Sequence, residues 1–235
     1  MSDIELIFFD MDGTLLIEDV TDPYGSKARS VWSLIANHLG DDASKREQEA
    51  RQKCYDREYR SPRELLEDVL EIFREGGLCK DYFYEVVGSI EYFPGVPETF
   101  DEVNERGYKT AVISGGFKAM AEKVAEDLKI DYVFAACELL WGHDGYLTGW
   151  NLFSLDYKSK LSYAKEIINE CGVDESRCAF FGNGNNDVYI AEWLKGAGGI
   201  SVALNGSEKL QNVCSYAVNQ LPDARDFRAV LKYIL

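Results

Sequence analysis

The chain has 235 residues, which suits one α/β domain or a domain with a smaller insert, and its formal net charge is −16. This acidic balance, with no basic run of five or more residues, argues against nucleic acid or an anionic membrane as a partner, but it does not exclude a phosphate substrate. The six cysteines form no CxxC pair and there are only two histidines, so a zinc site is not expected and the thiols are predicted to be reduced. The sequence shows no signal-peptide pattern and no apolar run near the roughly 20 residues that span a bilayer. We therefore expect a cytoplasmic protein.

Strand-like and helix-like segments alternate over most of the chain. The apolar run IELIFF, residues 4–9, predicts a first strand. Further strands are expected at residues 109–114, 132–137, 178–182 and 199–204, and helices at residues 97–107, 117–128, 161–171, 187–195 and 227–234. The Asp144-Gly145 pair between two apolar runs predicts a β-hairpin. Repeated strand–helix units predict an α/β fold with a Rossmann-like, doubly wound and mainly parallel sheet.

Residues 17–91 interrupt this alternation and contain no convincing strand. Helical patterns are expected instead at residues 30–39, 41–60, 62–75 and 79–90, of which the second is strongly charged and reads as a solvated helix. Ser61 and Glu64 form a capping box, with Pro62 at the first helical position. The sequence therefore predicts an α/β core of residues 1–16 and 92–235, and an all-helical cap of residues 17–91 inserted after the first strand.

Three polar clusters follow predicted strands: DMDGT at residues 10–14, SGG at residues 114–116, and GNGNND at residues 182–187. In an open parallel sheet, ligands bind beyond the carboxyl ends of the strands, so the three clusters are expected at one edge. Carboxylates there would attract a hard cation such as Mg²⁺. The Gly and Ser groups, and a Lys from the segment DYKSK, suit a phosphate. A metal-assisted reaction on a phosphate group is the hypothesis that accounts for paired acids after a buried strand.

The segments DMDGTL, ISGG, a Lys and GNGNND, in this order, resemble the four motifs of the haloacid dehalogenase-like hydrolases. Within that superfamily, the segment YFPGVPETFDEVNERGYKTAVISGGF and the DGYLTG hairpin resemble the phosphoserine-phosphatase-like group. The resemblance implies a Mg²⁺-dependent phosphatase that hydrolyses a small phosphorylated metabolite through an aspartyl-phosphate intermediate. It also implies that the helical insert is a cap that excludes water and reads the leaving group.

The resemblance assigns a role to each matching residue. Asp10 would be the nucleophile, and Asp12 would protonate the leaving oxygen and then activate water. Ser114 and the N–H group of Gly115 would hold the phosphoryl oxygens. The motif lysine would be Lys158, although Lys160 gives the commoner distance to GNGNND. The expected Mg²⁺ ligands are Asp10, Asp12, Asn183 and Asp187, and the other expected substrate contacts are Asn186 and Asp19.

Two positions depart from the family pattern. Asn183 stands where an Asp is usual, so weaker metal binding is expected, with Asp187 carrying more of the load. An ungapped match puts Glu71 where the phosphoserine enzymes have an Arg in the cap. Phosphoserine or a related metabolite is therefore the candidate substrate. Two alternatives stay open: a phosphotransferase or phosphomutase that uses the same intermediate, and a catalytically weakened phosphate-binding protein, which Asn183 would favour. The oligomeric state does not follow from the sequence.

Overall fold

The computed structural model describes residues 4–153 and 158–235, and the chain forms two compact units. The first, which we call the core unit, comprises Met1–Ile17, Tyr92–Ala135 and Tyr157–Leu235. The second, which we call the insert unit, comprises Glu18–Glu91 and Ala136–Asp156. No helix among the described residues is both long enough and apolar enough to cross a membrane.

A seven-stranded sheet has the order β6-β5-β4-β1-β7-β8-β9. Its strands are β1 (Leu6–Phe9), β4 (Lys109–Phe117), β5 (Tyr132–Trp141), β6 (Leu147–Leu152), β7 (Cys178–Gly182), β8 (Ile200–Leu204) and β9 (Tyr216–Val218). Strand β1 pairs in parallel with β4 on one side and with β7 on the other, and β8 and β9 continue in parallel from β7. Only the pairing of β5 with β6, the predicted hairpin, is antiparallel among the pairings defined between these strands. The predicted mainly parallel α/β sheet is thus confirmed.

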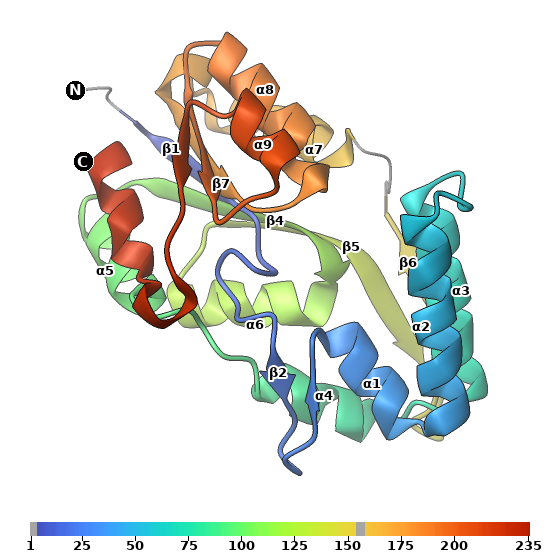
Figure 1. Ribbon diagram of the computed structural model, residues 1–235. Coiled ribbons are helices and arrows are strands. Elements are labelled where there is room, and N and C mark those ends of the chain that lie inside the picture. Colours follow the sequence, from blue (N-terminus) through green and yellow to red (C-terminus); the bar gives the residue numbers. More distant parts are fainter. Residues whose placement is uncertain (1–3, 154–157) are drawn as a thin grey trace. The chain divides into compact units, whose positions relative to one another are not determined.

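Helices cover both faces of the sheet in the core unit, as Figure 1 shows. One face carries α7 (Ser159–Cys171), α8 (Val188–Gly196) and α9 (Glu208–Val213), and the other carries α5 (Val96–Glu105) and α6 (Lys118–Leu128). Because successive strand residues point to opposite faces, Leu6 and Phe8 pack with the first group of helices. All four residues of β1 are fully buried, which explains the uninterrupted apolar run in the sequence.

The opposite face of the sheet has an aromatic core around Phe9. Its ring centroid lies 4.8 Å from that of Phe100 on α5, 5.5 Å from that of Phe181 on β7 and 6.0 Å from that of Phe227. Phe227 begins a 3₁₀ segment, η4 (Phe227–Tyr233), where the sequence predicted a closing helix. Phe9 is the last residue of β1, so this cluster anchors the strand next to the residue that follows it, Asp10.

The substitution Phe9→Ala is expected to lower the free energy of unfolding by about 3–5 kcal/mol, because it leaves a cavity among the three neighbouring rings. Urea unfolding followed by circular dichroism measures this change. The exposed ring of Tyr55 offers a control, and Tyr55→Ala should change the free energy by no more than about 0.5 kcal/mol. Equal effects of the two substitutions would contradict the assigned packing.

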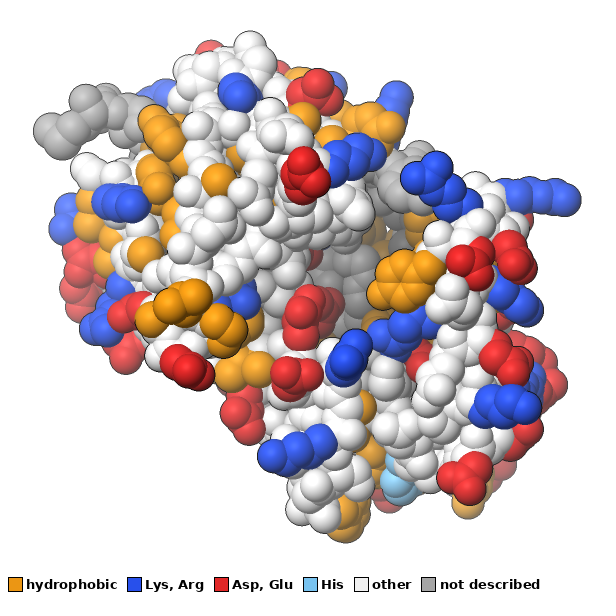
Figure 2. All heavy atoms as spheres, in the orientation of Figure 1, with side chains coloured by type: hydrophobic (Ala, Val, Ile, Leu, Met, Phe, Trp, Pro, Cys, Tyr) orange, Lys and Arg blue, Asp and Glu red, His pale blue; other side chains and the backbone are white. Residues whose placement is uncertain are grey.

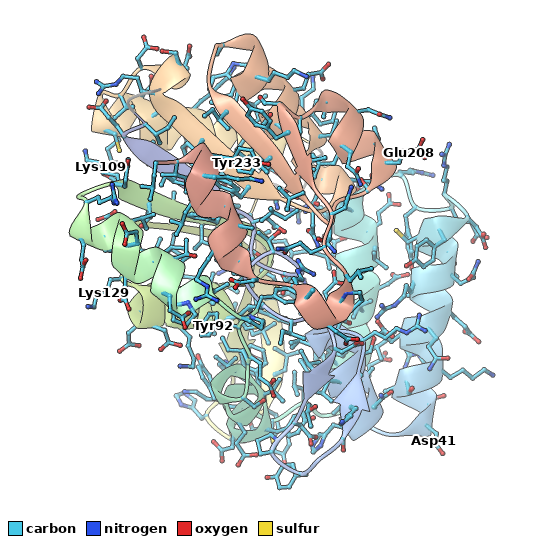
Figure 3. The ribbon with its side chains drawn as sticks, turned by 60° about the vertical axis from the view of Figure 1, so that its left-hand side comes forward. Asp41, Tyr92, Lys109, Lys129, Glu208 and Tyr233 are labelled. Atoms are coloured by element: carbon cyan, nitrogen blue, oxygen red, sulfur yellow. The ribbon has the colours of Figure 1, made fainter. Side chains whose placement is uncertain are left out.

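Four helices form most of the insert unit: α1 (Val31–His38), α2 (Asp41–Tyr55), α3 (Pro62–Glu75) and α4 (Lys80–Gly88). The Ser61 hydroxyl accepts a hydrogen bond from the Glu64 N–H and caps α3, as the sequence predicted, whereas the Glu64 carboxylate accepts from the Arg60 N–H. The charged run predicted as a solvated helix over residues 41–60 forms α2, which ends earlier, at Tyr55, and its ion pairs include Lys45 with Glu49. Figure 2 shows acidic and basic side chains interspersed over this unit.

The insert is not all-helical, which corrects the prediction for residues 17–91. Strands β2 (Val20–Thr21) and β3 (Lys27–Ala28) form a two-stranded antiparallel sheet. The buried Asp22 carboxylate closes their turn by accepting hydrogen bonds from the N–H groups of Tyr24 and Ser26. Burial alone would raise the pKa of Asp22, but these bonds and one from the Tyr82 hydroxyl outweigh it, so the pKa is lowered.

The hairpin also differs from its predicted assignment, because the sequence placed residues 136–156 in the core. In the structure this segment belongs to the insert unit. The Leu147 N–H donates to the Leu78 carbonyl, and the Lys80 N–H donates to the Gly145 carbonyl. The rings of Phe83 and Trp141 lie 5.5 Å apart between centroids. Backbone hydrogen bonds between segments this far apart in the chain leave no periodic signal in the sequence.

Candidate active site

Strand β1 delivers the first acidic residue to the carboxyl end of the sheet. The Asp10 N–H still donates to the Phe181 carbonyl, at 2.9 Å, so the backbone remains part of the sheet at this point. The Asp10 side chain is buried, and its Oδ2 atom accepts a hydrogen bond of 3.2 Å from the Thr14 hydroxyl. A tight turn follows, in which the Met11 carbonyl accepts from the N–H groups of Leu15 and Leu16. These hydrogen bonds fix the backbone of the first motif between Met11 and Leu16.

The second motif lies within β4, next to β1. The Ser114 hydroxyl is buried, donates to Asp12 Oδ2 at 3.4 Å, and accepts from the Gly116 N–H at 2.9 Å. Unlike Asp10, Asp12 is exposed. The structure therefore brings the second acid of the first motif to the hydroxyl that was predicted to hold a phosphoryl oxygen.

The fourth motif follows β7, on the other side of β1. Asp187 is fully buried, and its Oδ2 atom accepts from the N–H groups of Asn183 and Gly184, at 3.0 and 2.9 Å. A Cβ atom at Gly182 would lie only 2.5 Å from that same oxygen, so a larger residue there would displace the carboxylate. The sequence GNGNND thus forms a loop that wraps one carboxylate and aims it at the sheet edge.

The structure places Lys160, and not the preferred Lys158, against the acidic residues of the first and fourth motifs. The buried Lys160 ammonium bonds to Asp10 Oδ1 and to Asp187 Oδ1, the second at 2.6 Å. Lys158 is exposed, and its ammonium lies 5.6 Å from the centroid of the Tyr189 ring. Near the start of α7, two residues correspond to about 200° of helix rotation, so the two lysines point to different sides. The spacing to GNGNND was the signal that favoured Lys160.

Burial and charge together set the ionisation of this cluster. Burial and the nearby Asp187 carboxylate raise the pKa of Asp10 to about 7, against the opposing effect of Lys160. Burial alone would lower the pKa of Lys160, but the carboxylates of Asp10 and Asp187 outweigh it and raise that pKa. Lys160 therefore stays charged, and one ammonium faces two buried carboxylates. At neutral pH a pKa of about 7 leaves Asp10 partly protonated, so a bound cation would favour its ionised, nucleophilic form.

The remaining predicted residues differ in how they relate to the cluster of Asp10, Lys160 and Asp187. A Cβ atom at Gly115 would lie 3.9 Å from Asn186 Nδ2, so these two predicted substrate contacts are neighbours. The Asn183 N–H is used by Asp187, and the Asn183 carbonyl accepts from the Ser207 N–H at 2.9 Å. Asp19 is exposed and belongs to the insert unit. The core unit by itself brings together all the other predicted residues except Lys158.

Within residues 4–153 and 158–235, no three side chains of the His, Cys, Asp and Glu types group as a metal site. Mg²⁺, however, usually keeps several water ligands and needs only one or two carboxylates. The carboxyl groups of Asp10 and Asp187 converge on the Lys160 ammonium, so two oxygen donors of the kind that Mg²⁺ prefers lie close together. This donor set fits Mg²⁺ better than it fits zinc, which prefers thiolate and imidazole ligands.

A mainly parallel α/β sheet gathers two aspartates, a serine, a lysine and a glycine-rich acidic loop at its carboxyl edge, which is the arrangement expected for the hydrolases whose four motifs the sequence resembles. The chain belongs to the haloacid dehalogenase-like hydrolase family, whose model matches residues 7–192. The predicted membership in this family, and in its phosphoserine-phosphatase-like group, is confirmed.

Two curated relatives and one solved structure illustrate the similarity. A phosphoserine phosphatase of Lactococcus lactis is 29% identical over 230 residues, which cover 97% of this chain and 94% of the relative. One of Streptococcus thermophilus is 28% identical over 226 residues, with 95% and 94% covered. The structure of a substrate-bound phosphoserine phosphatase complex superimposes with a TM-score of 0.78 at 23% identity, and the match covers 100% of both chains.

Proposed function

We propose that this protein is a Mg²⁺-dependent phosphatase that hydrolyses a small phosphate monoester, either phosphoserine or a related metabolite. One observation carries the proposal: the Lys160 ammonium joins Asp10 and Asp187 at the sheet edge. The names of the similar proteins support phosphoserine as the first substrate to test.

The reaction divides into two displacements at phosphorus. First, an Asp10 carboxylate oxygen bonds to phosphorus while the bond from phosphorus to the leaving oxygen breaks, and Asp12 gives that oxygen a proton. Then a water oxygen attacks phosphorus, Asp12 takes the proton of that water, and the bond from phosphorus to Asp10 breaks. Asp12 suits both proton transfers because it is exposed and lies beside Ser114, where the phosphoryl oxygens are expected.

Charge neutralisation is the other task of the site. Lys160, the Ser114 hydroxyl and the Gly115 N–H would stabilise the negative charge that spreads over the phosphoryl oxygens. Asp10, the Asp12 carbonyl, Asn183 and Asp187 would hold Mg²⁺. When bound, Mg²⁺ would offset the repulsion between the nucleophilic carboxylate and the phosphate.

A turnover assay tests the proposal directly. The 235-residue chain is incubated with Mg²⁺ and with phosphoserine, an aryl phosphate or one of a panel of phosphorylated metabolites, and the release of inorganic phosphate is measured. Release of phosphate is expected, and it should stop when a chelator removes the metal. Transfer of the phosphoryl group to an added alcohol, in place of water, would point to a phosphotransferase. No turnover of any member of the panel would contradict the proposal.

Asn183→Asp is expected to lower the Mg²⁺ concentration that gives half-maximal activity by about 3–10-fold, because a carboxylate adds charge to the metal ligands. A Mg²⁺ titration at saturating substrate measures this. Asn185→Asp adds the same charge at an exposed position of the same loop, two residues before the motif ends at Asp187, and should shift the titration less. Equal shifts in the two variants would mean that the added negative charge acts through the electrostatic potential of the loop, and that residue 183 is not a ligand of Mg²⁺.

A further inference from the structure

An arginine from the C-terminal part of the chain reaches the loop of the first motif. The Arg225 guanidinium donates a hydrogen bond to the Gly13 carbonyl, 212 residues away in sequence. The same guanidinium lies 3.4 Å from the centroid of the Phe93 ring. Gly13 stands between Asp12 and Thr14, the two residues whose side chains bond to Ser114 and Asp10. Arg225 therefore contacts the first motif at its turn.

The segment that carries Arg225 is itself firmly held. Gln220 and Asp226 exchange hydrogen bonds of 3.1 and 3.3 Å, and the Phe227 N–H donates to the Pro94 carbonyl at 2.7 Å. Asn205, which follows β8, donates to the Gln220 carbonyl at 2.6 Å and accepts from the Gln220 N–H at 3.0 Å. These bonds fix both sides of the segment, so Arg225 is presented from a rigid support.

The loop after β8 also reaches the fourth motif. The Ser207 N–H donates to the Asn183 carbonyl at 2.9 Å, and the Ser207 hydroxyl donates to Asn185 Oδ1 at 2.8 Å. Asn205 and Ser207 lie two residues apart, so one short loop contacts both the segment of Arg225 and the fourth motif. The C-terminal part of the core unit thus touches two of the loops that carry predicted catalytic and metal-binding residues.

The turn of the first motif has a reason to need outside support. Gly13 has a φ of +72°, a conformation open to glycine, which also gives the backbone freedom to leave it. Its N–H donates to the Leu16 carbonyl, but its own carbonyl points to Arg225. Rotation of the peptide group between Gly13 and Thr14 would displace the Thr14 hydroxyl from Asp10. A charged donor on the Gly13 carbonyl opposes that rotation.

We propose that Arg225 is a positioning residue for the reaction: it fixes the Gly13 carbonyl so that Asp10 and Asp12 keep their reactive orientation. This inference rests on the proposed function. Because small displacements of reacting groups cost rate more than binding, loss of the guanidinium should lower kcat and leave KM nearly unchanged.

The test compares Arg225→Met, Arg225→Lys and the matched control Arg228→Met. Arg228 lies on the same segment, is exposed, and pairs with Asp226 instead of with a motif. With Mg²⁺ and an aryl phosphate, Arg225→Met is expected to lower kcat about 10-fold with KM within about twofold. Arg225→Lys should recover part of the loss because it keeps one charged donor, and Arg228→Met should keep the wild-type kcat.

The outcomes separate this inference from the proposed function. Absence of phosphatase activity in the wild-type protein would refute the proposed function, whatever Arg225 does. An active wild type with an unchanged kcat in Arg225→Met would overturn only the role of Arg225. The thermal unfolding midpoint of each variant is measured as well. The proposed role of Arg225 would also be overturned if Arg225→Lys did not recover kcat, or if the loss of kcat only followed the fraction of unfolded protein.

Discussion

Asp10→Asn is expected to reduce kcat by about 10⁴-fold or more, because an amide has no charged oxygen to attack phosphorus. The substitution keeps the shape of the side chain: the amide oxygen still accepts from Lys160, and the amide NH2 group donates to the Thr14 hydroxyl where Oδ2 had accepted from it. Because the pKa of Asp10 is about 7, the neutral amide replaces a side chain that is already partly protonated at neutral pH, so the folded state should not be lost. Steady-state phosphate release in the presence of Mg²⁺, with circular dichroism as a check on folding, measures the effect.

The matched control for this experiment is Asp101→Asn. Asp101 is an exposed aspartate on α5 in the same unit, so its substitution changes the net charge equally and should leave kcat within about twofold of wild type. A trapping experiment adds a second reading: denaturing the wild-type enzyme during turnover should leave phosphate covalently bound, and the Asp10→Asn protein should carry none. Turnover that survives Asp10→Asn would refute Asp10 as the nucleophile.

The sequence predicted the parts of the site that depend on short segments. An apolar run too hydrophobic to be a surface strand, followed at once by two acids, located β1 and the first motif. The same reasoning located Ser114 at β4 and Asp187 after β7, because ligand sites in parallel sheets lie at the carboxyl ends of strands. The order of the motifs then supplied the family, which the family model confirms over residues 7–192.

The errors arose where the outcome depends on contacts between distant segments. Which of Lys158 and Lys160 faces Asp10 depends on where α7 begins, and Ser159 is its first residue. The preceding residues 154–157, which include part of the DYKSK segment, lie outside the described residues. The grouping of the hairpin with the insert depends on backbone bonds such as that from Leu147 to Leu78, and these have no local signature.

The sequence analysis also did not predict the structure of part of the C-terminal region of the core unit. The short strand β9 and helix α9 did not stand out from the sequence, because three and six residues are too few to show a periodic pattern. The ordered loops around Asn205 and Gln220 are held by side-chain amides, a residue type that sequence reasoning assigns to turns without saying what they bind. The role proposed for Arg225 could therefore be seen only in three dimensions.

Lys160→Met is expected to have the second largest effect, and it acts on activity and stability together. Removing the ammonium leaves the buried Asp10 and Asp187 carboxylates facing each other without a counter-charge. A loss of about 1–3 kcal/mol in the free energy of unfolding is expected for the metal-free protein at neutral pH, because Asp10, whose pKa is already about 7, takes up a proton once the ammonium is gone. Turnover should fall by about 10²–10³-fold, because the charge that stabilises the transferring phosphoryl group is gone.

Lys158→Met is the matched control, since it removes the same charge two residues earlier in the chain. Lys158 is exposed and its ammonium faces Tyr189, so both kcat and stability should stay close to wild type. Added Mg²⁺ should restore part of the stability of Lys160→Met, because a cation between the two carboxylates replaces the missing charge, whereas it should do little for Lys158→Met. A larger loss of activity in Lys158→Met than in Lys160→Met would reverse the assignment of the motif lysine. The bonds from Lys160 to Asp10 and Asp187 would then stabilise the fold without taking part in the reaction.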